Sequence, residues 1–235
     1  MIHEAIILAG GVGSRLKAAV SDKPKCLAPV NGIPFLTYLL TYLQSQKIAR
    51  FIFSLGYKHE MIEAFLKENF SHLDYELSIE AQALGTGGAI KMACKKVANE
   101  NAFVCNGDTM FKIDAEKLAD AHEELNSLCT IALKPMKNFD RYGNVEIDRQ
   151  NAIIAFKEKK FCSAGIINGG VYALNAFAFA ELELPEKFSF ESDFLEKQIT
   201  GLYGNVQDAF FIDIGIPEDY HRAQSEKELL EILKK

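Results

Sequence analysis

The sequence LAGGVGSRL at residues 8–16 is the stretch around which the chain is organised, and the apolar run at residues 5–8 leads into it. Such a run, apolar on both faces, predicts a buried strand of a parallel sheet. The three glycines that follow, at 10, 11 and 13, allow positive φ angles and close approach to a ligand. Consecutive N–H groups in a glycine-rich turn form an anion site. Arg15 adds a planar fork that fits phosphate oxygens, and Lys25 adds a compact positive charge. We therefore expect a polyphosphate site at the end of the first strand.

Two familiar glycine-rich motifs do not fit this stretch. A Walker A loop requires a Lys-Ser or Lys-Thr pair after the glycines, and none follows here. The dinucleotide fingerprint needs a small residue where Leu16 stands and an acidic residue after the second strand. The second expected strand ends instead in Gly56 and Tyr57. The sequence therefore disfavours a dinucleotide-dependent dehydrogenase.

Apolar periodicity predicts alternating strands and helices over the first half of the chain. Strands are expected at residues 5–8, 49–55, 74–80 and 102–105, and helices from Pro34 onward, at 59–70 and at 87–97. This order predicts an α/β fold with a Rossmann-like, mostly parallel central sheet and helices on both of its faces. Because ligands bind at the carboxyl ends of such strands, we expect residues 8–16, 80–88 and 106–108 to lie on one rim.

The pattern changes near residue 129. Short strands separated by turn residues are expected at 130–133, 143–147, 153–156 and 170–174, and a last helix at 217–233. These strands predict an antiparallel sub-region added to the parallel sheet. No Gly-, Pro- or Ser-rich linker interrupts the chain. We therefore expect one domain over residues 1–235, with halves at about 1–128 and 129–235.

Two carboxylates stand at the ends of apolar runs, Asp108 after residues 102–105 and Asp213 within FFIDIGIP at 210–217. A carboxylate in such a place is costly to bury unless it is paired or bound to a metal. Brought to the same rim, the two would suit Mg²⁺, which prefers oxygen ligands and takes few of them from the protein. The alternative is that each Asp caps a turn or a helix, which is the commoner role of an isolated Asp after a strand.

Composition and charge disfavour several classes of protein. A formal net charge of −6 argues against a nucleic-acid-binding surface, and no apolar stretch approaches the roughly 20 residues of a membrane span. The five cysteines are widely spaced without a Cys-x-x-Cys motif, which indicates buried thiols in a reducing compartment. No signal peptide is recognisable. We therefore expect a cytoplasmic protein without nucleic-acid or membrane partners.

The combination of GGVGSRL at 10–16 with KPKCLAPVNGIP at 23–34 resembles the sugar-1-phosphate nucleotidyltransferases, also called NDP-sugar pyrophosphorylases. Ser14 stands where this family usually has Thr, which keeps the hydroxyl, and Cys26 stands where it mostly has Pro. The resemblance covers nearly the whole chain. It implies that an NTP and a sugar 1-phosphate are the substrates, that NDP-sugar and pyrophosphate are the products, and that Mg²⁺ is the cofactor. It leaves open whether the chain forms a homo-oligomer.

The resemblance also implies roles for individual residues. The implied metal ligands are Asp108 and Asp213, and the implied catalytic residues are Arg15, Lys25 and Lys159, the last on the sugar phosphate. The implied nucleotide-binding residues are Leu8, Gly10, Gly11, Gly13, Ser14, Glu80, Gly85, Gly87, Gly88 and Asn106. The implied sugar-binding residues are Gly143, Glu158, Asn168 and Gly169. For the glycines at 85–88 the alternative is a glycine turn at a helix N-terminus, and for those at 143 and 168–170 a tight loop.

Within the family, five motifs look most like the short guanylyltransferases that act on D-glycero-α-D-manno-heptose 1-phosphate. They are LGTGGA at 84–89, NGDT at 106–109, DRYGNV at 140–145, NGGVY at 168–172 and FSFESDFLE at 188–196. GTP is then the expected nucleotide. A mannose-1-phosphate guanylyltransferase, a uridylyl- or cytidylyltransferase, and a non-catalytic subunit that binds sugar nucleotides are the alternatives.

Overall fold

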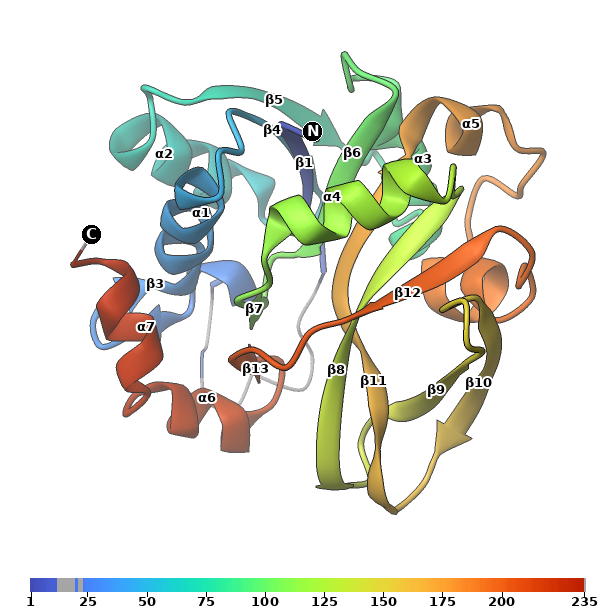
Figure 1. The fold of residues 1–235 in the computed structure, drawn as a ribbon. Coiled ribbons are helices and arrows are strands. Elements are labelled where there is room, and N and C mark those ends of the chain that lie inside the picture. The colour runs from blue at the N-terminus through green and yellow to red at the C-terminus, as the bar shows by residue number, and fades with distance from the viewer. Residues whose placement is uncertain (12–19, 21–22, 235) are drawn as a thin grey trace.

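A mostly parallel sheet forms the centre of the molecule, whose computed structural model describes residues 1–11, 20 and 23–234. The strand order is β10-β9-β11-β6-β1-β4-β5 (Figure 1). The parallel strands are β1 (Glu4–Leu8), β4 (Arg50–Leu55), β5 (Asp74–Ile79) and β6 (Asn101–Asn106). The apolar run at residues 5–8 therefore forms a central strand, and the predicted α/β fold is confirmed.

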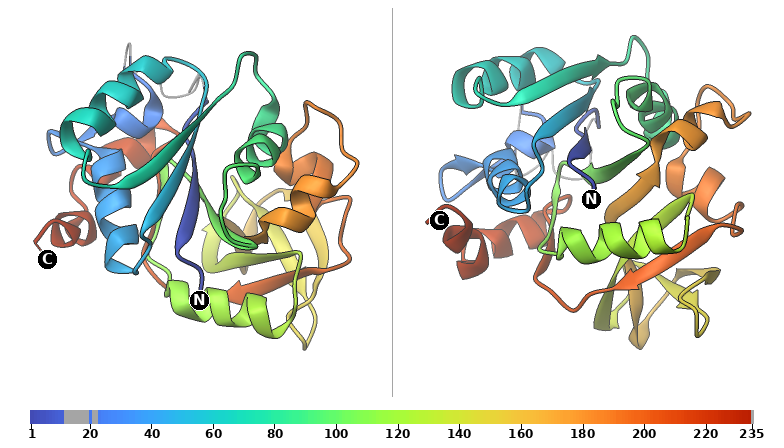
Figure 2. Two further views of the ribbon diagram at one scale, coloured as in Figure 1. Left: turned by 90° about the horizontal axis from the view of Figure 1, so that it is seen from above. Right: turned by 45° about the horizontal axis from the view of Figure 1, so that its top comes forward.

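Helices cover both faces of the sheet (Figure 2). Side chains of β1 alternate between the faces, so Ile7 packs into one apolar core and Ile6 into the other. The first core contains residues of α1 (Phe35–Ser45), α2 (His59–Asn69), α4 (Ala115–Glu124), α6 (Pro217–Ala223) and α7 (Lys227–Ile232). The second contains residues of α3 (Gly85–Cys94) and α5 (Ala176–Glu181). None of the helices in the described part of the chain has the length and apolar character that crossing a membrane requires.

The second half of the chain extends the sheet beside β6. β11 (Cys162–Asn175) pairs antiparallel with β6 and with β8 (Cys129–Phe139). β9 (Gly143–Ile147) pairs antiparallel with β10 (Ile153–Lys159). The predicted antiparallel sub-region is therefore present. β12 (Leu202–Val206), which the periodicity does not predict, differs from the rest because it pairs with β8 in parallel.

Shorter elements complete the rim. β2 (Pro29–Val30) pairs with β3 (Ile33–Pro34), and β7 (Thr109–Phe111) pairs with β13 (Phe211–Asp213). η1 (Lys25–Leu27) is a 3₁₀ turn and η2 (Phe190–Leu195) a π-helical one. The β7–β13 pair positions the site, because its register sets Asp213 opposite Thr109, the residue after Asp108.

The predicted single helix at 217–233 is wrong, because the chain forms α6 and α7 with a turn between them. Ala223 and Leu229 are both buried in the first core. Six residues of continuous helix would turn their side chains about 120° apart. Breaking the helix at 224–226 lets both segments face the same core.

His122 of α4 predicts a loss of stability in acid. Its ring nitrogens lie 3.1 Å from Thr130 Oγ1 and 3.2 Å from Asn101 Oδ1, and burial lowers the pKa of His122 to about 4. Between pH 6.5 and 4 the unfolded chain binds the proton and the folded chain does not, so the free energy of unfolding falls by up to about 3 kcal/mol as the pH drops. Urea unfolding at pH 7, 5 and 4 measures this loss. His122→Gln should reduce it, whereas His72→Gln, at an exposed histidine, should leave it unchanged.

Candidate active site

Two adjoining cavities open at the carboxyl ends of the strands. The glycine-side cavity, of about 450 Å³, is lined by the predicted residues Leu8, Gly10, Gly11, Lys25, Glu80, Gly85, Asn106, Asp108 and Asp213. The lobe-side cavity, of about 650 Å³, is lined by the predicted residues Asn106, Gly143, Glu158, Lys159, Asn168, Gly169 and Asp213. Asn106, Thr109, Glu191 and Asp213 line both. The predicted residues Gly13, Ser14 and Arg15 lie outside the described residues.

Asp108 and Asp213 converge where the cavities meet. A Cβ placed on Gly215 would lie 2.8 Å from Asp213 Oδ1, 3.4 Å from Asp108 Oδ2 and 3.4 Å from Lys25 Nζ. Lys25 Nζ donates to Asp108 Oδ2 at 3.1 Å. Lys25 begins η1, which the buried Cys26 and Leu27 anchor in the core. The fold therefore holds one cation and two carboxylates around a single point.

The electrostatics of this cluster favour a bound cation. Burial, and then the negative charge of Asp108, raise the pKa of Asp213 above the ordinary value of 3.8. The N–H of Gly215, which donates to Asp213 Oδ1 at 2.8 Å, and the charge of Lys25 offset part of this shift. An ionised Asp213 is thus incompletely compensated by the protein.

These donors fit a magnesium ion. Within residues 1–11, 20 and 23–234 no group of three or more His, Cys, Asp or Glu side chains is arranged to hold a metal. Mg²⁺ needs no such group, because it binds through one or two carboxylates and takes its other ligands from water and substrate phosphates. Asp108 and Asp213 supply the oxygen ligands of that kind of site.

The Glu80 carboxylate lies beside Gly10 and Gly56, the glycines that follow β1 and β4. A Cβ on Gly10 would approach Glu80 Oε1 to 3.0 Å, so a side chain at this position would displace the carboxylate. The N–H of Leu84 donates to Glu80 Oε2 at 2.8 Å. Burial raises the pKa of Glu80, and this hydrogen bond offsets part of the rise. The result is a fixed acceptor group inside the glycine-side cavity.

The glycines at the start of α3 divide into two kinds. Gly85 lines the glycine-side cavity with a φ of +72°, which few other residues adopt. Gly87 and Gly88 are buried and face Phe188 and Glu186, where a Cβ would clash. The structure thus gives these two glycines a packing role, and their contact with a nucleotide base stays a prediction.

The lobe-side cavity is shaped by an irregularity in β11. Residues 168–170 lie inside this strand, so the alternative of a tight loop between strands does not hold there. The register of β11 against β8 shifts between Asn168 and Tyr172. Asn168 Oδ1 accepts from the N–H of Gly170 at 2.9 Å, and its Nδ2 donates to Tyr172 Oη at 3.0 Å. Such bulges redirect side chains beside active sites, and this one faces Asn168 toward the cavity.

Two residues of β10 bring charge to the lobe-side cavity. Glu158 and Lys159 are exposed and line the lobe-side cavity. Lys157 forms an ion pair with Glu146 at 3.2 Å, whereas no carboxylate among the described residues pairs with Lys159. Lys159 therefore presents an uncompensated positive charge that suits an anionic ligand.

Comparison of the sequence with known protein families identifies the family of this chain. The family model described as nucleotidyl transferase matches residues 4–229. The chain belongs to the nucleotidyl transferase family.

Several nucleotidyl transferases are similar over nearly the whole chain. The D-glycero-α-D-manno-heptose 1-phosphate guanylyltransferase of Aneurinibacillus thermoaerophilus is 51% identical over 225 residues, 95% of this chain and 97% of that one. The protein of the same name from Campylobacter jejuni is 47% identical over 221 residues, 93% of this chain and 97% of that one. HddC from Yersinia pseudotuberculosis, crystallised with GMP-PN, is 40% identical with a TM-score of 0.85, over 95% of this chain and 98% of that one.

Glu191 of this nucleotidyl transferase lines both cavities, although the sequence motifs imply no role for it. Its Oε2 accepts from Thr86 Oγ1 at 2.8 Å and from Ser189 Oγ at 3.2 Å. Phe190 and Phe194, both buried, anchor η2 on either side of it. Acidic and hydroxyl residues interleaved with phenylalanines in FSFESDFL at 188–195 are the signal that could have identified it.

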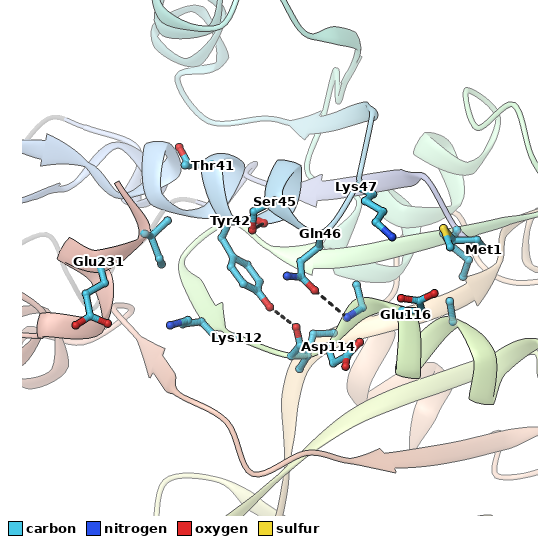
Figure 3. Close-up of a pocket in the computed structure, with 15 residues that line it drawn as sticks. Met1, Thr41, Tyr42, Ser45, Gln46, Lys47, Lys112, Asp114, Glu116 and Glu231 are labelled. Carbon is cyan, nitrogen blue, oxygen red and sulfur yellow. Dashed lines mark hydrogen bonds between the residues drawn. The ribbon is translucent and has the colours of Figure 1, made fainter. Parts of the chain in front are cut away.

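A third cavity, of about 650 Å³, lies away from the predicted site residues (Figure 3). Tyr42 donates to the carbonyl of Ile113, and Gln46 Oε1 accepts from the N–H of Ala115 at 3.2 Å. These two contacts tie the end of α1 to the start of α4. They give the polar groups in this part of the cavity a structural role.

Proposed function

We propose that the chain transfers the guanylyl group of GTP to D-glycero-α-D-manno-heptose 1-phosphate and releases pyrophosphate. The observation that carries this proposal is the 51% identity, over 95% of the chain, to an enzyme of that name. The two cavities that meet at Asp213 support it, since a two-substrate transfer needs neighbouring sites for donor and acceptor. GTP is assigned to the glycine-side cavity and the sugar 1-phosphate to the lobe-side cavity.

The reaction needs charge neutralisation more than proton transfer. An oxygen of the sugar phosphate forms a bond to the α-phosphorus, and the bond from that phosphorus to the β-phosphate oxygen breaks with release of pyrophosphate. The attacking phosphate is already an anion, so no general base is required. Two unit charges at ~4 Å repel by about 4 kcal/mol at an effective dielectric constant near 20. The protein must offset this repulsion.

The proposed residues divide this task. Lys159 holds the sugar phosphate in line with the α-phosphorus, and Lys25, with Arg15 from the sequence motif, neutralises the triphosphate. Asp108 and Asp213 would hold Mg²⁺, which when bound supplies positive charge to the phosphate oxygens. Catalysis then comes from position and electrostatics, as in other phosphoryl-transfer sites.

A substrate matrix tests the proposed function. Pyrophosphate release is measured for four NTPs against heptose, mannose and glucose 1-phosphates, with Mg²⁺ and with excess EDTA. We expect the highest kcat/KM for GTP with the heptose 1-phosphate, and no turnover with EDTA. Preference for mannose 1-phosphate or for another NTP would assign a different member of the family. Silence with every pair would favour the non-catalytic subunit.

Glu80→Gln should weaken the preference for guanine. Guanine presents its N1–H and 2-amino group side by side, and a carboxylate accepts from both, whereas an amide offers one acceptor and a donor that would oppose them. We expect kcat/KM for GTP to fall about 10- to 100-fold, the value of hydrogen bonds to a charged group. ITP, which lacks the 2-amino group, should lose less. Glu68→Gln, at an exposed residue of α2, is the matched control, and an unchanged kcat/KM for GTP in Glu80→Gln would remove Glu80 from base recognition.

We further propose that the chain acts as one domain in the cytoplasm, with residues 1–128 binding the nucleotide and 129–235 the sugar phosphate. The five free cysteines support a reducing compartment. The continuation of the sheet from β6 into β11 supports one domain.

A further inference from the structure

A buried carboxylate of α6 is held by two arginines from different parts of the chain. Asp219 is 6% exposed. Its Oδ2 accepts from Arg141, and its Oδ1 lies 3.3 Å from the guanidinium of Arg222. A buried charge of this kind is tolerated only when it is paired. The two arginines differ in origin, since Arg222 belongs to α6 itself and Arg141 lies in the turn between β8 and β9.

The Arg141–Asp219 pair joins the two sides of the lobe-side cavity. The turn at 140–142 leads directly to Gly143, which lines that cavity. On the other side, α6 follows the short segment after Asp213, which lines both cavities. The ion pair therefore bridges the antiparallel sub-region and the segment that carries Asp213.

Arg141 also holds Tyr142, an aromatic residue that lines the lobe-side cavity. Its guanidinium carbon lies 5.5 Å from the centroid of the Tyr142 ring, and its Nη2 donates to Tyr142 Oη at 3.3 Å. The Tyr142 ring meets Phe211 edge to face at 5.9 Å. Both aromatic residues line the lobe-side cavity, whereas Arg141 is not among the residues that line it. Its influence on a ligand must pass through Tyr142, Gly143 and α6.

We propose that Arg141 is a positioning residue for the acceptor substrate. By forming an ion pair with Asp219 and stacking on Tyr142, it sets the shape of the lobe-side cavity around the sugar 1-phosphate. This inference rests on the proposed assignment of that cavity to the sugar phosphate. Arg141 suits the role because a planar guanidinium can pair with a carboxylate and stack on a ring at once. None of Arg141, Tyr142 and Asp219 lines the glycine-side cavity.

Arg141→Met and Arg222→Met form a matched pair of variants. Each removes one arginine from Asp219, but Arg141 alone reaches it from the sugar-side turn. We expect Arg141→Met to raise KM for the sugar 1-phosphate about tenfold, the scale of a modest misplacement, with KM for GTP unchanged. Arg222→Met should leave both KM values unchanged. Arg141→Lys, which keeps the charge without the planar fork, should give an intermediate KM and serves as the test if Arg141→Met does not fold.

Two results would overturn the positioning role. Equal effects of Arg141→Met and Arg222→Met would mean that the arginines serve only to neutralise Asp219. A parallel rise in KM for GTP would mean general damage to the fold. Calorimetry of sugar 1-phosphate binding to the unaltered chain and to Arg141→Met compares the two Kd values without turnover, and we expect the higher Kd in Arg141→Met. The proposed function is tested separately by turnover of the unaltered chain, so the two can fail independently.

Discussion

Asp213→Asn should lower kcat by about 1000-fold at saturating Mg²⁺, GTP and sugar 1-phosphate. Asp213 would act through the ion that it holds, and weakening that ion removes positive charge from the transition state, which costs about 100- to 1000-fold for one such contact. Pyrophosphate release measures the loss. Asp120→Asn, at an exposed aspartate of α4, is the control and should keep full activity. A kcat within about tenfold of the unaltered value would remove Asp213 from the reaction.

The same substitution should raise the Tm of the metal-free protein. Burial and the charge of Asp108 raise the pKa of Asp213, so the folded chain binds this proton more tightly than the unfolded chain. An ionised Asp213 therefore destabilises the fold, and this cost disappears as the pH falls through the raised pKa. Thermal unfolding in EDTA should show a gain for Asp213→Asn at pH 7 that shrinks toward pH 4. A loss of Tm at pH 7 would contradict this account of the cluster.

Lys25→Ala should lower kcat about 100-fold, the scale of losing one charged transition-state contact. Lys25 Nζ lies 3.1 Å from Asp108 Oδ2, beside the point where the cavities meet. Its removal also takes away the ion pair that Lys25 forms with Asp108 at 3.1 Å. The Tm of the metal-free variant should therefore fall, opposite in sign to Asp213→Asn.

Lys95→Ala, at an exposed lysine after α3, is the control for Lys25→Ala and should change neither kcat nor Tm. Near-normal turnover of Lys25→Ala would remove this lysine from phosphate binding. The sequence motif predicts a loss of about 100-fold for Arg15→Ala as well. Normal turnover in both variants would exclude the proposed mechanism.

The parallel half of the fold could be predicted because its signals are local. The apolar runs of β1 and β4 and the one-sided helix α1 are visible in single windows of sequence, and the carboxyl ends of parallel strands share a rim. That rule places Glu80 and Asp108 on the same rim of the sheet, although they follow different strands, β5 and β6. The break between α6 and α7 could not be predicted in this way, because apolar residues at helical spacing do not show that Ala223 and Leu229 must face the same core.

The remaining features depend on contacts between distant segments. β7 and β13 are three-residue strands from far apart in the chain, so no local pattern shows that Asp213 lies beside Asp108. Gly87 and Gly88 fit a base-binding segment in sequence, but their close neighbours come from residues 186–188. Glu191 is in the site because η2 packs beside α3, which the sequence does not display.

In the proposed mechanism, Asp108 and Asp213 together hold a divalent ion beside the nucleotide. Mn²⁺ binding, followed by electron paramagnetic resonance with GDP present, tests it most directly in the unaltered chain, Asp108→Asn, Asp213→Asn and the double variant. We predict that each single substitution raises the Kd for Mn²⁺ by at least about tenfold, since changes merely adjacent to a ligand already cost that much. The double substitution should abolish binding. Equal Mn²⁺ affinity in all four proteins would contradict the account.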